Sequence, residues 1–342
     1  MAAYISFQPS DFFTPKLYTG TGSEITVTGV GFQPDFTWLK DRSAIQHHQL
    51  YDSARGAGEV IYSNLINAEG TVTQQLKSWT SDGYVIGTDG SVNTNTNLYA
   101  SWNWKGGTTS GLTGGTITPS AYSINTTSGF GVYHYNCTGA NANIAHGLGA
   151  APEMLITKSL GDTSPWAVWH TGIANTEYLV LNTTAAKATG AAMWNSTSPT
   201  STLFYLGTDG QTNGTGKNNV MYAFASVKGY SKFGSYEGNG NVDGPFIYTG
   251  FRPGFVMIKN IDGVEGWDMY DIKRNPGNLT DNKLKADSSV AEEVDSTVAI
   301  DILSNGFKIR TTSTEINLST AVYAAFAEFP LVSSNSKAGV AR

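Results

Sequence analysis

Apolar and polar residues alternate along much of the chain, which is the pattern of β-strands with one buried face. Ile25 and Val27 alternate with polar residues, and Phe36, Trp38 and Lys40 follow the same two-residue period. The lysine at the end of this strand is expected to pack its stem on the sheet and to extend its ammonium to water at the sheet edge. The pattern therefore predicts antiparallel strands.

Turn signals separate these strands, and helical periodicity is almost absent. The best helical candidate, Asn278 to Glu293, is short and interrupted by polar residues, so it is expected to be a loop with at most one turn. Dipeptides typical of two-residue hairpins occur at Asp82-Gly83, Asp89-Gly90, Asp209-Gly210 and Asn305-Gly306.

One strand pattern occurs three times in the chain. Each copy has a proline, an apolar residue two positions later, another four positions later and a lysine six positions later. The copies begin at Pro34, Pro152 and Pro253 and end at Lys40, Lys158 and Lys259, and each follows a tyrosine: Tyr18, Tyr135 and Tyr236. The closing strands of the copies align on Tyr99, Tyr222 and Tyr323, although the pairs Phe224-Ala225 and Phe326-Ala327 favour a register shifted by one residue. Such matched spacings indicate internal duplication.

The period of roughly 100 residues is that of a whole β-sandwich domain rather than of a solenoid or propeller repeat. We therefore predict an all-β fold of three tandem antiparallel β-sandwich units of jelly-roll type. The expected organisation is an N-terminal docking arm (1–15), repeat 1 (16–105), a Gly/Ser/Thr-rich linker (106–129), repeat 2 (130–228), repeat 3 (233–329) and a C-terminal tail (330–342). Because the third repeat follows the second after a very short connection, these two are expected to form a rigid pair, with repeat 1 semi-independent. The residues predicted to be buried on this strand are Phe36, Trp38, Met154, Ile156, Phe255 and Met257.

Composition narrows the possible functions. The net charge is -6 and no basic stripe occurs, which disfavours binding to nucleic acid. No signal peptide is expected from the first residues, and no apolar run approaches the ~20 residues that a membrane helix needs, so membrane insertion is not expected. The single cysteine, Cys137, cannot form an internal disulfide and is expected to be a small buried residue.

Catalytic and metal-binding patterns are weak. His47 and His48 would point to opposite faces of a strand, so an ordinary loop is favoured over a metal pair. The Asp-Gly loops at 87–97 and 207–219 have oxygen ligands suited to calcium, but their spacing does not match the twelve-residue calcium loop and the alternative stays open. We assign no catalytic, cofactor-binding or metal-ligating residue and expect no enzymatic activity. Four tryptophans are candidates for stacking on sugars, with core packing favoured for each: Trp102, Trp166, Trp169 and Trp194.

The motifs as a set resemble a known family. They include Tyr-Thr-Gly followed by Gly-Phe-x-Pro-Asp-Phe-x-Trp-x-Lys, then Ser-Asp-Gly-Tyr and Tyr-Ala-Ser-Trp-Asn-Trp-Lys-Gly. The chain resembles tandem-repeat, jelly-roll, tail-fibre-like structural proteins of tailed bacteriophages, many of them marine. The resemblance covers all three copies, and copy three departs from it with Gly254 where copy one has Asp35.

The resemblance implies a virion structural protein of tail-fibre or adhesion type that contributes to particle assembly and host-surface contact. The expected partners are further copies of the chain, with a trimer favoured, other virion proteins of the tail or capsid, and a host-surface polysaccharide. Two alternatives stay open: a capsid decoration or head-fibre protein, and a carbohydrate-binding or carbohydrate-active sandwich protein.

Overall fold

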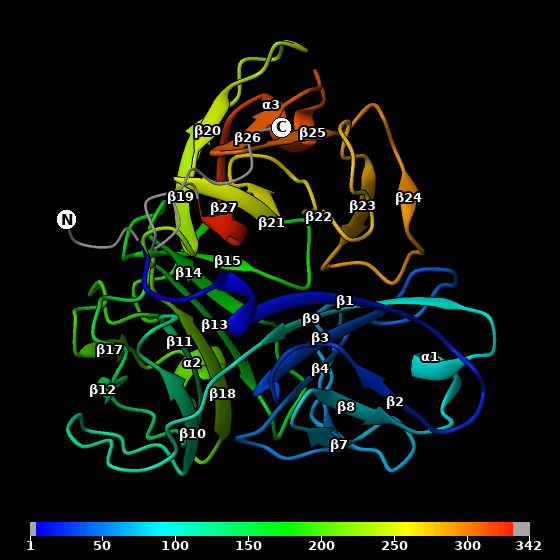
Figure 1. The fold of residues 1–342 in the computed structure, drawn as a ribbon. Helices are drawn as coiled ribbons and strands as arrows, with labels where there is room; N and C mark the ends of the chain where they lie inside the picture. Colours follow the sequence, from blue (N-terminus) through cyan, green and yellow to red (C-terminus); the bar gives the residue numbers. More distant parts are fainter. Residues whose placement is uncertain (1–4, 331–342) are drawn as a thin grey trace.

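The computed structural model describes residues 5–330, which form three groups of antiparallel sheets around a common centre (Figure 1). The chain is almost entirely β-structure, so the predicted all-β sandwich fold is confirmed. In Figure 1 the first group (blue to cyan) lies at lower right, the second (green) at lower left and the third (yellow to red) at the top. We call these groups units 1, 2 and 3.

Each unit pairs a large sheet with a small one. In unit 1 the large sheet has the order β1 (Phe13–Thr19), β9 (Leu98–Trp104), β3 (Phe36–Asp41), β4 (Gln49–Asp52), and the small sheet β2 (Ile25–Thr28), β8 (Gly83–Ile86), β7 (Leu76–Thr80). The unit also contains a 3-10 turn (Pro9–Asp11), the pair β5 (Glu59–Val60) and β6 (Gly70–Thr71), and the short helix α1 (Gly90–Asn93).

Units 2 and 3 repeat this order with extra strands at the edges. The large sheet of unit 2 runs β10 (Ala121–Asn125), β11 (Phe130–Asn136), β18 (Asn218–Phe224), β13 (Met154–Ser159), β14 (Ala167–His170), β15 (Glu177–Val180), β16 (Ala188–Thr189); its small sheet is β12 (Ala142–Ala145) and β17 (Leu203–Leu206), and its helix is α2 (Gly210–Asn213). The large sheet of unit 3 runs β19 (Ser231–Glu237), β27 (Thr320–Pro330), β21 (Phe251–Asn260), β22 (Trp267–Asp271), β23 (Asn282–Lys285), β24 (Glu293–Val294); its small sheet is β20 (Phe246–Tyr248), β26 (Gly306–Ile309), β25 (Ile300–Leu303), and its helix is α3 (Thr314–Asn317).

The repeated proline-to-lysine pattern falls on the same strand of each sheet. Phe36 pairs with Trp104, Met154 with Phe224, and Phe255 with Phe326, so β3, β13 and β21 hold equivalent places beside β9, β18 and β27. The same registers make Tyr18, Tyr135 and Tyr236 equivalent on β1, β11 and β19. They also show that aligning Tyr99, Tyr222 and Tyr323 is wrong and that the register shifted by one residue holds for units 2 and 3, because Phe224 and Phe326 occupy the same position.

The large sheets are buried on both faces. One face packs on the small sheet of its own unit: in unit 1, Leu39 and Tyr51 of the large sheet belong to one buried cluster with Tyr84 of the small sheet. The other face carries the six residues predicted to be buried, and they are all 5% exposed or less. Their burial is confirmed, but they face the centre of the molecule, where the three large sheets meet. These strands therefore have two buried faces, and the two-residue period predicted only one of them.

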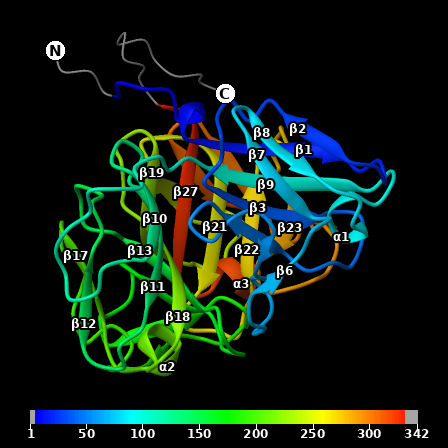
Figure 2. The same ribbon diagram turned by 90° about the horizontal axis from the view of Figure 1, so that it is seen from below.

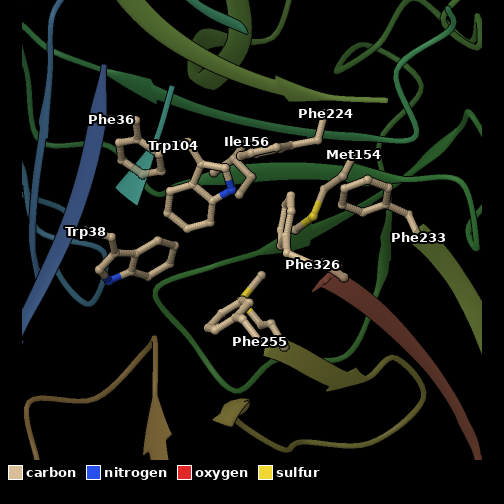
Figure 3. Close-up of a pocket in the computed structure, with 11 residues that line it drawn as sticks. Phe36, Trp38, Trp104, Met154, Ile156, Phe224, Phe233, Phe255 and Phe326 are labelled. Atoms are coloured by element: carbon tan, nitrogen blue, oxygen red, sulfur yellow. The ribbon is translucent and has the colours of Figure 1, made fainter. Parts of the chain in front are cut away.

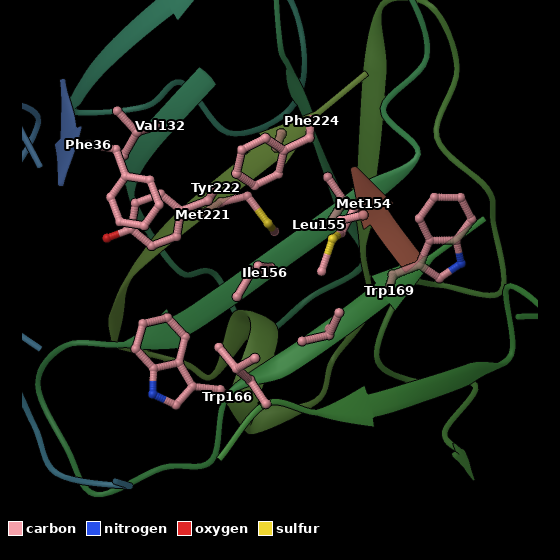
Figure 4. Close-up of a cluster of buried hydrophobic side chains, with 14 of the residues drawn as sticks. Phe36, Val132, Met154, Leu155, Ile156, Trp166, Trp169, Met221, Tyr222 and Phe224 are labelled. Carbon is pink, nitrogen blue, oxygen red and sulfur yellow. The ribbon is translucent and has the colours of Figure 1, made fainter. Parts of the chain in front are cut away.

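The core is continuous across the units, and the expected semi-independence of repeat 1 is wrong. One cluster of buried side chains contains Trp104 of unit 1, Phe224 of unit 2 and Phe326 of unit 3. Phe36 of unit 1 stacks on Tyr222 of unit 2 with ring centroids 4.3 Å apart, which places a unit 1 side chain inside the cluster of unit 2 (Figure 4). Aromatic contacts of this kind tie unit 1 to both neighbours.

Two connecting segments differ from their expected form. The stretch expected to be a linker (106–129) contains β10, which adds to the edge of β11, and the stretch expected to be an arm (1–15) contains the start of β1 at Phe13. The loop predicted at Asn278–Glu293 has no helix, as expected, but it contains strand β23 and ends at the first residue of β24. Sequence patterning missed these strands because they are short and mostly polar. The expected tail lies almost entirely outside the described residues.

The turn dipeptides divide into two kinds. Asp82-Gly83 and Asn305-Gly306 belong to tight hairpins that lead into β8 and β26, as predicted. Asp89-Gly90 and Asp209-Gly210 are not hairpins: each aspartate caps a helical turn by accepting a hydrogen bond, from the backbone N–H of Ser91 and of Gln211 respectively.

One buried asparagine closes the equivalent loop of every unit. The side chain of Asn213 accepts from Thr138 N and donates to the carbonyls of Ala140 and Gly207. Asn93 and Asn317 make the same three kinds of bond in units 1 and 3. These bonds hold the loop that follows β1, β11 or β19 against the short helix that precedes the last strand of the unit.

We expect Asn213→Ala to lower the free energy of unfolding by about 1–3 kcal/mol, because it leaves buried backbone groups without partners. Urea unfolding monitored by tryptophan fluorescence measures the change. The matched control is Asn136→Ala at an exposed position, where a change within about 0.5 kcal/mol is expected. Equal effects at the two positions would contradict the role assigned to the buried amide.

Candidate functional site: interfaces, centre and corners

The residues considered for metal binding have structural partners. His48 is buried and its Nδ1 accepts a hydrogen bond from Trp38 Nε1 (2.8 Å), whereas His47 contacts Asn64. Within residues 5–330 no group of three or more histidine, cysteine, aspartate or glutamate side chains could hold a metal ion. Cys137 is a buried free thiol, as expected, and burial raises its pKa to about 12. The described part of the chain contains no helix long and apolar enough to cross a membrane.

Each unit sends one loop onto the next unit, and the third loop returns to the first. Backbone N–H groups of Glu69, Lys187 and Glu292 donate to the carbonyls of Leu160, Ile261 and Arg42 respectively. The contacts therefore run from unit 1 to unit 2, from unit 2 to unit 3 and from unit 3 to unit 1. Head-to-tail contacts that close in this way form a ring, here within one chain.

A polar residue at the end of β4, β14 and β22 completes each interface. Asp52 accepts from the Tyr222 hydroxyl of unit 2 (2.6 Å), and Asp271 accepts from Trp102 Nε1 of unit 1 (3.1 Å). At the equivalent position of unit 2, a ring nitrogen of His170 lies 3.1 Å from the Tyr323 carbonyl of unit 3. Asp52, His170 and Asp271 thus each connect their unit to the next one from the same strand position.

Two of these interfaces also bury an arginine three residues after the aspartate. Arg55 pairs with Asp52 and with Glu69 (2.9 Å), and Arg274 pairs with Asp271 and with Glu292 (3.0 Å). Both guanidinium groups are almost completely buried. The sequence signal for this network was the Tyr-Asp-x-x-Arg motif at 51–55 and again at 270–274, which the search for internal repeats missed because unit 2 lacks it.

The three repeated lysines are buried, so the prediction that their ammonium groups reach water is wrong. Lys40, Lys158 and Lys259 are each 0% exposed. Their Nζ atoms donate to backbone carbonyls, and for Lys40 and Lys259 these include the carbonyls of Ser289 and Thr184 on the loop of the preceding unit. Burial lowers the pKa of each to about 8. The loop of a neighbouring unit covers the sheet edge at which water was expected.

We expect protonation of His170 to destabilise the fold in mild acid. Burial lowers its pKa to about 4, although its contact with the Tyr323 carbonyl opposes this. The unfolded chain, with a histidine pKa of ~6.5, binds the proton first, so this group removes stability as the pH falls from about 6.5 to 4, by up to about 3 kcal/mol.

The measurement is the free energy of unfolding of the wild type and His170→Gln between pH 7 and pH 4. The wild type should lose more stability than the variant over this range. His47→Gln, at an exposed histidine, is the control. Burial also lowers the pKa of His47, so this variant should lose slightly less stability than the wild type but stay closer to it than His170→Gln does. Parallel curves for the wild type and His170→Gln would contradict the prediction.

The centre of the molecule is not a binding site. The side chains of all three units enclose a cavity of about 20 Å³ there (Figure 3). Its lining is entirely apolar: Phe36, Trp38, Trp104, Met154, Ile156, Phe224, Phe233, Phe255, Met257, Ala324 and Phe326. A space this small holds at most about one water and offers it no hydrogen bonds, so it is a packing gap.

Three equivalent corners lie around this centre, each between one unit and the start of the next. At the first corner, Asp35 accepts from Gly106 N (2.8 Å) and from the Ser123 hydroxyl (2.8 Å) on β10, so the chain itself fills the space. At the third corner a groove of about 120 Å³ lies beside Phe13 and Gly254. The strand that fills the first corner, β10, runs beside β11 in unit 2 (Figure 2).

The second corner, between units 2 and 3, contains a larger groove than the third corner. Its groove of about 470 Å³ includes Glu153, Ser226, Lys232 and Tyr248 in its lining. The Lys232 ammonium lies 5.4 Å from the centre of the Tyr248 ring, and that tyrosine is 50% exposed. An exposed aromatic ring flanked by a carboxylate, a hydroxyl and an ammonium can stack on and hydrogen-bond to a polar ligand such as a sugar.

The sequence candidates for sugar stacking are not available for it. Trp102, Trp166, Trp169 and Trp194 are all 5% exposed or less, which confirms that core packing was the better interpretation. Trp166 and Trp267 each donate a hydrogen bond to a carbonyl of the preceding unit, that of Tyr62 and of Val180 respectively. The exposed aromatic residues on the described surface are instead Phe246, Tyr248 and Phe329.

Comparison with known proteins identifies a family but no function. A family model described as a domain of unknown function (DUF7483) matches residues 8–330, which covers all three units. No curated protein and no solved structure matches the chain significantly.

Proposed function

Because the chain belongs to the DUF7483 domain family, whose description states no activity, we propose a function from the geometry and from the resemblance to phage proteins. We propose that it is a non-enzymatic structural protein of a tailed bacteriophage particle, of tail-fibre or adhesion type. The observation that carries this proposal is the closed ring of three sandwiches around one core. Such a body is suited to a rigid scaffold, since its polar and charged groups at the interfaces are engaged with one another.

The proposed host contact lies at the second corner. Its groove combines the exposed Tyr248 ring with Glu153, Ser226 and Lys232, and a surface polysaccharide presents apolar sugar faces and hydroxyl groups that match this set. Binding by one groove would be weak, and several copies on one particle would raise the effective affinity.

Assembly into a homo-oligomer, with a trimer favoured, remains part of the proposal. The head-to-tail contacts are already used within the chain, so contacts between copies must involve other surfaces. β1 and β19 are edge strands of their large sheets, and neighbouring virion proteins or copies can cover such edges.

Mass spectrometry of purified particles of the phage that encodes the chain tests the proposed location. The proposal expects the protein at a fixed copy number per particle, and its absence from particles would refute it. Rapid hydrolysis of host glycans by the purified chain would favour a carbohydrate-active enzyme instead.

A binding assay tests the proposed contact surface. We expect Tyr248→Ala to weaken binding of the chain to host-surface polysaccharide about five- to twelvefold, since stacking on one ring accounts for ~1–1.5 kcal/mol. The control is Val264→Ala, at a 74% exposed apolar position outside the groove lining. Unchanged binding by Tyr248→Ala would exclude this corner as the contact site without excluding a virion role.

A further inference from the structure

Asp268 is a buried acid without a hydrogen-bonding partner. It lies on β22 and is 0% exposed, and within the described residues neither carboxylate oxygen has a hydrogen bond. Burial raises its pKa to about 8. At the equivalent positions, unit 1 has Gln49, whose amide is hydrogen-bonded, and unit 2 has Ala167. Only unit 3 places an acid here, and a buried carboxyl group without a hydrogen bond lowers stability.

Two lysines of the neighbouring strand share this environment. Lys285 on β23 lies directly opposite Asp268, and Lys283 lies two residues before it on the same face. The Lys283 side chain is 2% exposed, compared with 27% for Lys285. Burial lowers the pKa of the Lys283 ammonium, but the Asp268 carboxyl and the bonds to Asp295 and Glu315 raise it overall.

Glu315 of α3 supplies a proton acceptor at both lysines. Its Oε2 lies 3.2 Å from Lys283 Nζ and 2.9 Å from Lys285 Nζ. A buried neutral carboxylic acid, an amine and a carboxylate that exchanges protons with the amine are the groups needed for amide formation without an external reagent.

We propose that Lys283 and Asp268 become joined by an amide bond between Nζ and Cγ, with Glu315 as the proton acceptor. The Lys283 ammonium first gives a proton to the Glu315 carboxylate. The nitrogen lone pair then attacks Cγ of the neutral acid, the C–OH bond breaks, and the hydroxyl leaves as water with a second proton from nitrogen. Glu315 returns its proton to solvent, and no oxidant is required.

The distance that the side chains must span favours Lys283 over Lys285 as the nucleophile. Residues directly opposite on paired strands have Cα atoms roughly 5 Å apart, whereas diagonal neighbours are roughly 7–8 Å apart. An extended lysine and an aspartate together span the diagonal distance, but a direct pair would require the lysine to fold back. The bond would remove the unpaired buried acid and tie β22 to β23.

The intact mass of the purified, folded full-length chain tests this proposal. We expect the wild type to be one water lighter than its sequence mass, with a linked peptide pair containing Asp268 and Lys283 after proteolysis. Asp268→Ala and Lys283→Met should each restore the full sequence mass, and Asp268→Asn should be one ammonia lighter.

Two further variants distinguish the roles of the neighbouring groups. Lys285→Met should keep the mass loss, and Glu315→Gln should slow or abolish it. A folded wild type with the full sequence mass would overturn the proposal, as would a link from Asp268 to Lys285. The mass requires no assumption about the virion role, so the two proposals fail independently.

Discussion

Trp104→Ala is expected to lower the free energy of unfolding by about 3–5 kcal/mol, the range for large-to-small substitutions of buried aromatic residues. Trp104 is 3% exposed and lies beside the central cavity. Its ring lies within 6.4 Å of ring centroids from all three units: Phe13, Phe36, Phe224, Phe255 and Phe326. Alanine would enlarge the central cavity and remove ring contacts to all three units.

Urea unfolding followed by circular dichroism measures this loss. Trp79→Ala is the matched control, because Trp79 is partly exposed on β7 of the small sheet of unit 1. We expect a much smaller change for the control. If the Trp104 variant lost stability only in unit 1, with units 2 and 3 unfolding as in the wild type, the shared core would be refuted.

Asp271→Ala is expected to lower the free energy of unfolding by a similar amount, about 3–5 kcal/mol, because it removes one of the carboxylate partners of the buried Arg274 guanidinium. Asp271 and Arg274 are both completely buried as side chains, and Trp102 Nε1 donates to the same carboxylate. The substitution therefore removes an ion pair within unit 3 and the hydrogen bond that joins unit 3 to unit 1.

Thermal and urea unfolding at two salt concentrations measure the effect. The control is Glu24→Ala, which removes the surface pair with Lys77, whose side chains are 54% and 35% exposed. Its expected cost is at most about 1 kcal/mol and decreases with added salt. A cost for Asp271→Ala as small as that of the control would show that the buried network does not stabilise the interface.

The sequence predicted the parts of the fold that repeat. The spacing of Pro34, Pro152 and Pro253 located the same strand in each sheet, and the two-residue period predicted that Phe36 and its counterparts are buried. Both signals are local to a strand, where pattern and geometry are directly linked.

Contacts between units could not be predicted in this way. Lys40 donates to the carbonyl of Ser289, which is 249 residues away along the chain, and no local pattern reports such a pairing. The corner groove at Tyr248 was missed for the same reason, since it arises where two units meet. A search for repeated charged motifs would have found Asp52-x-x-Arg55 and Asp271-x-x-Arg274, and hence the buried interface network.

The central claim, that three sandwiches fold around one core as a closed ring, is tested most directly by scanning calorimetry of the wild-type chain. The shared cluster of buried residues predicts a single transition with equal calorimetric and van't Hoff enthalpies. Separate transitions, with one unit unfolding while the other two stay folded, would contradict it.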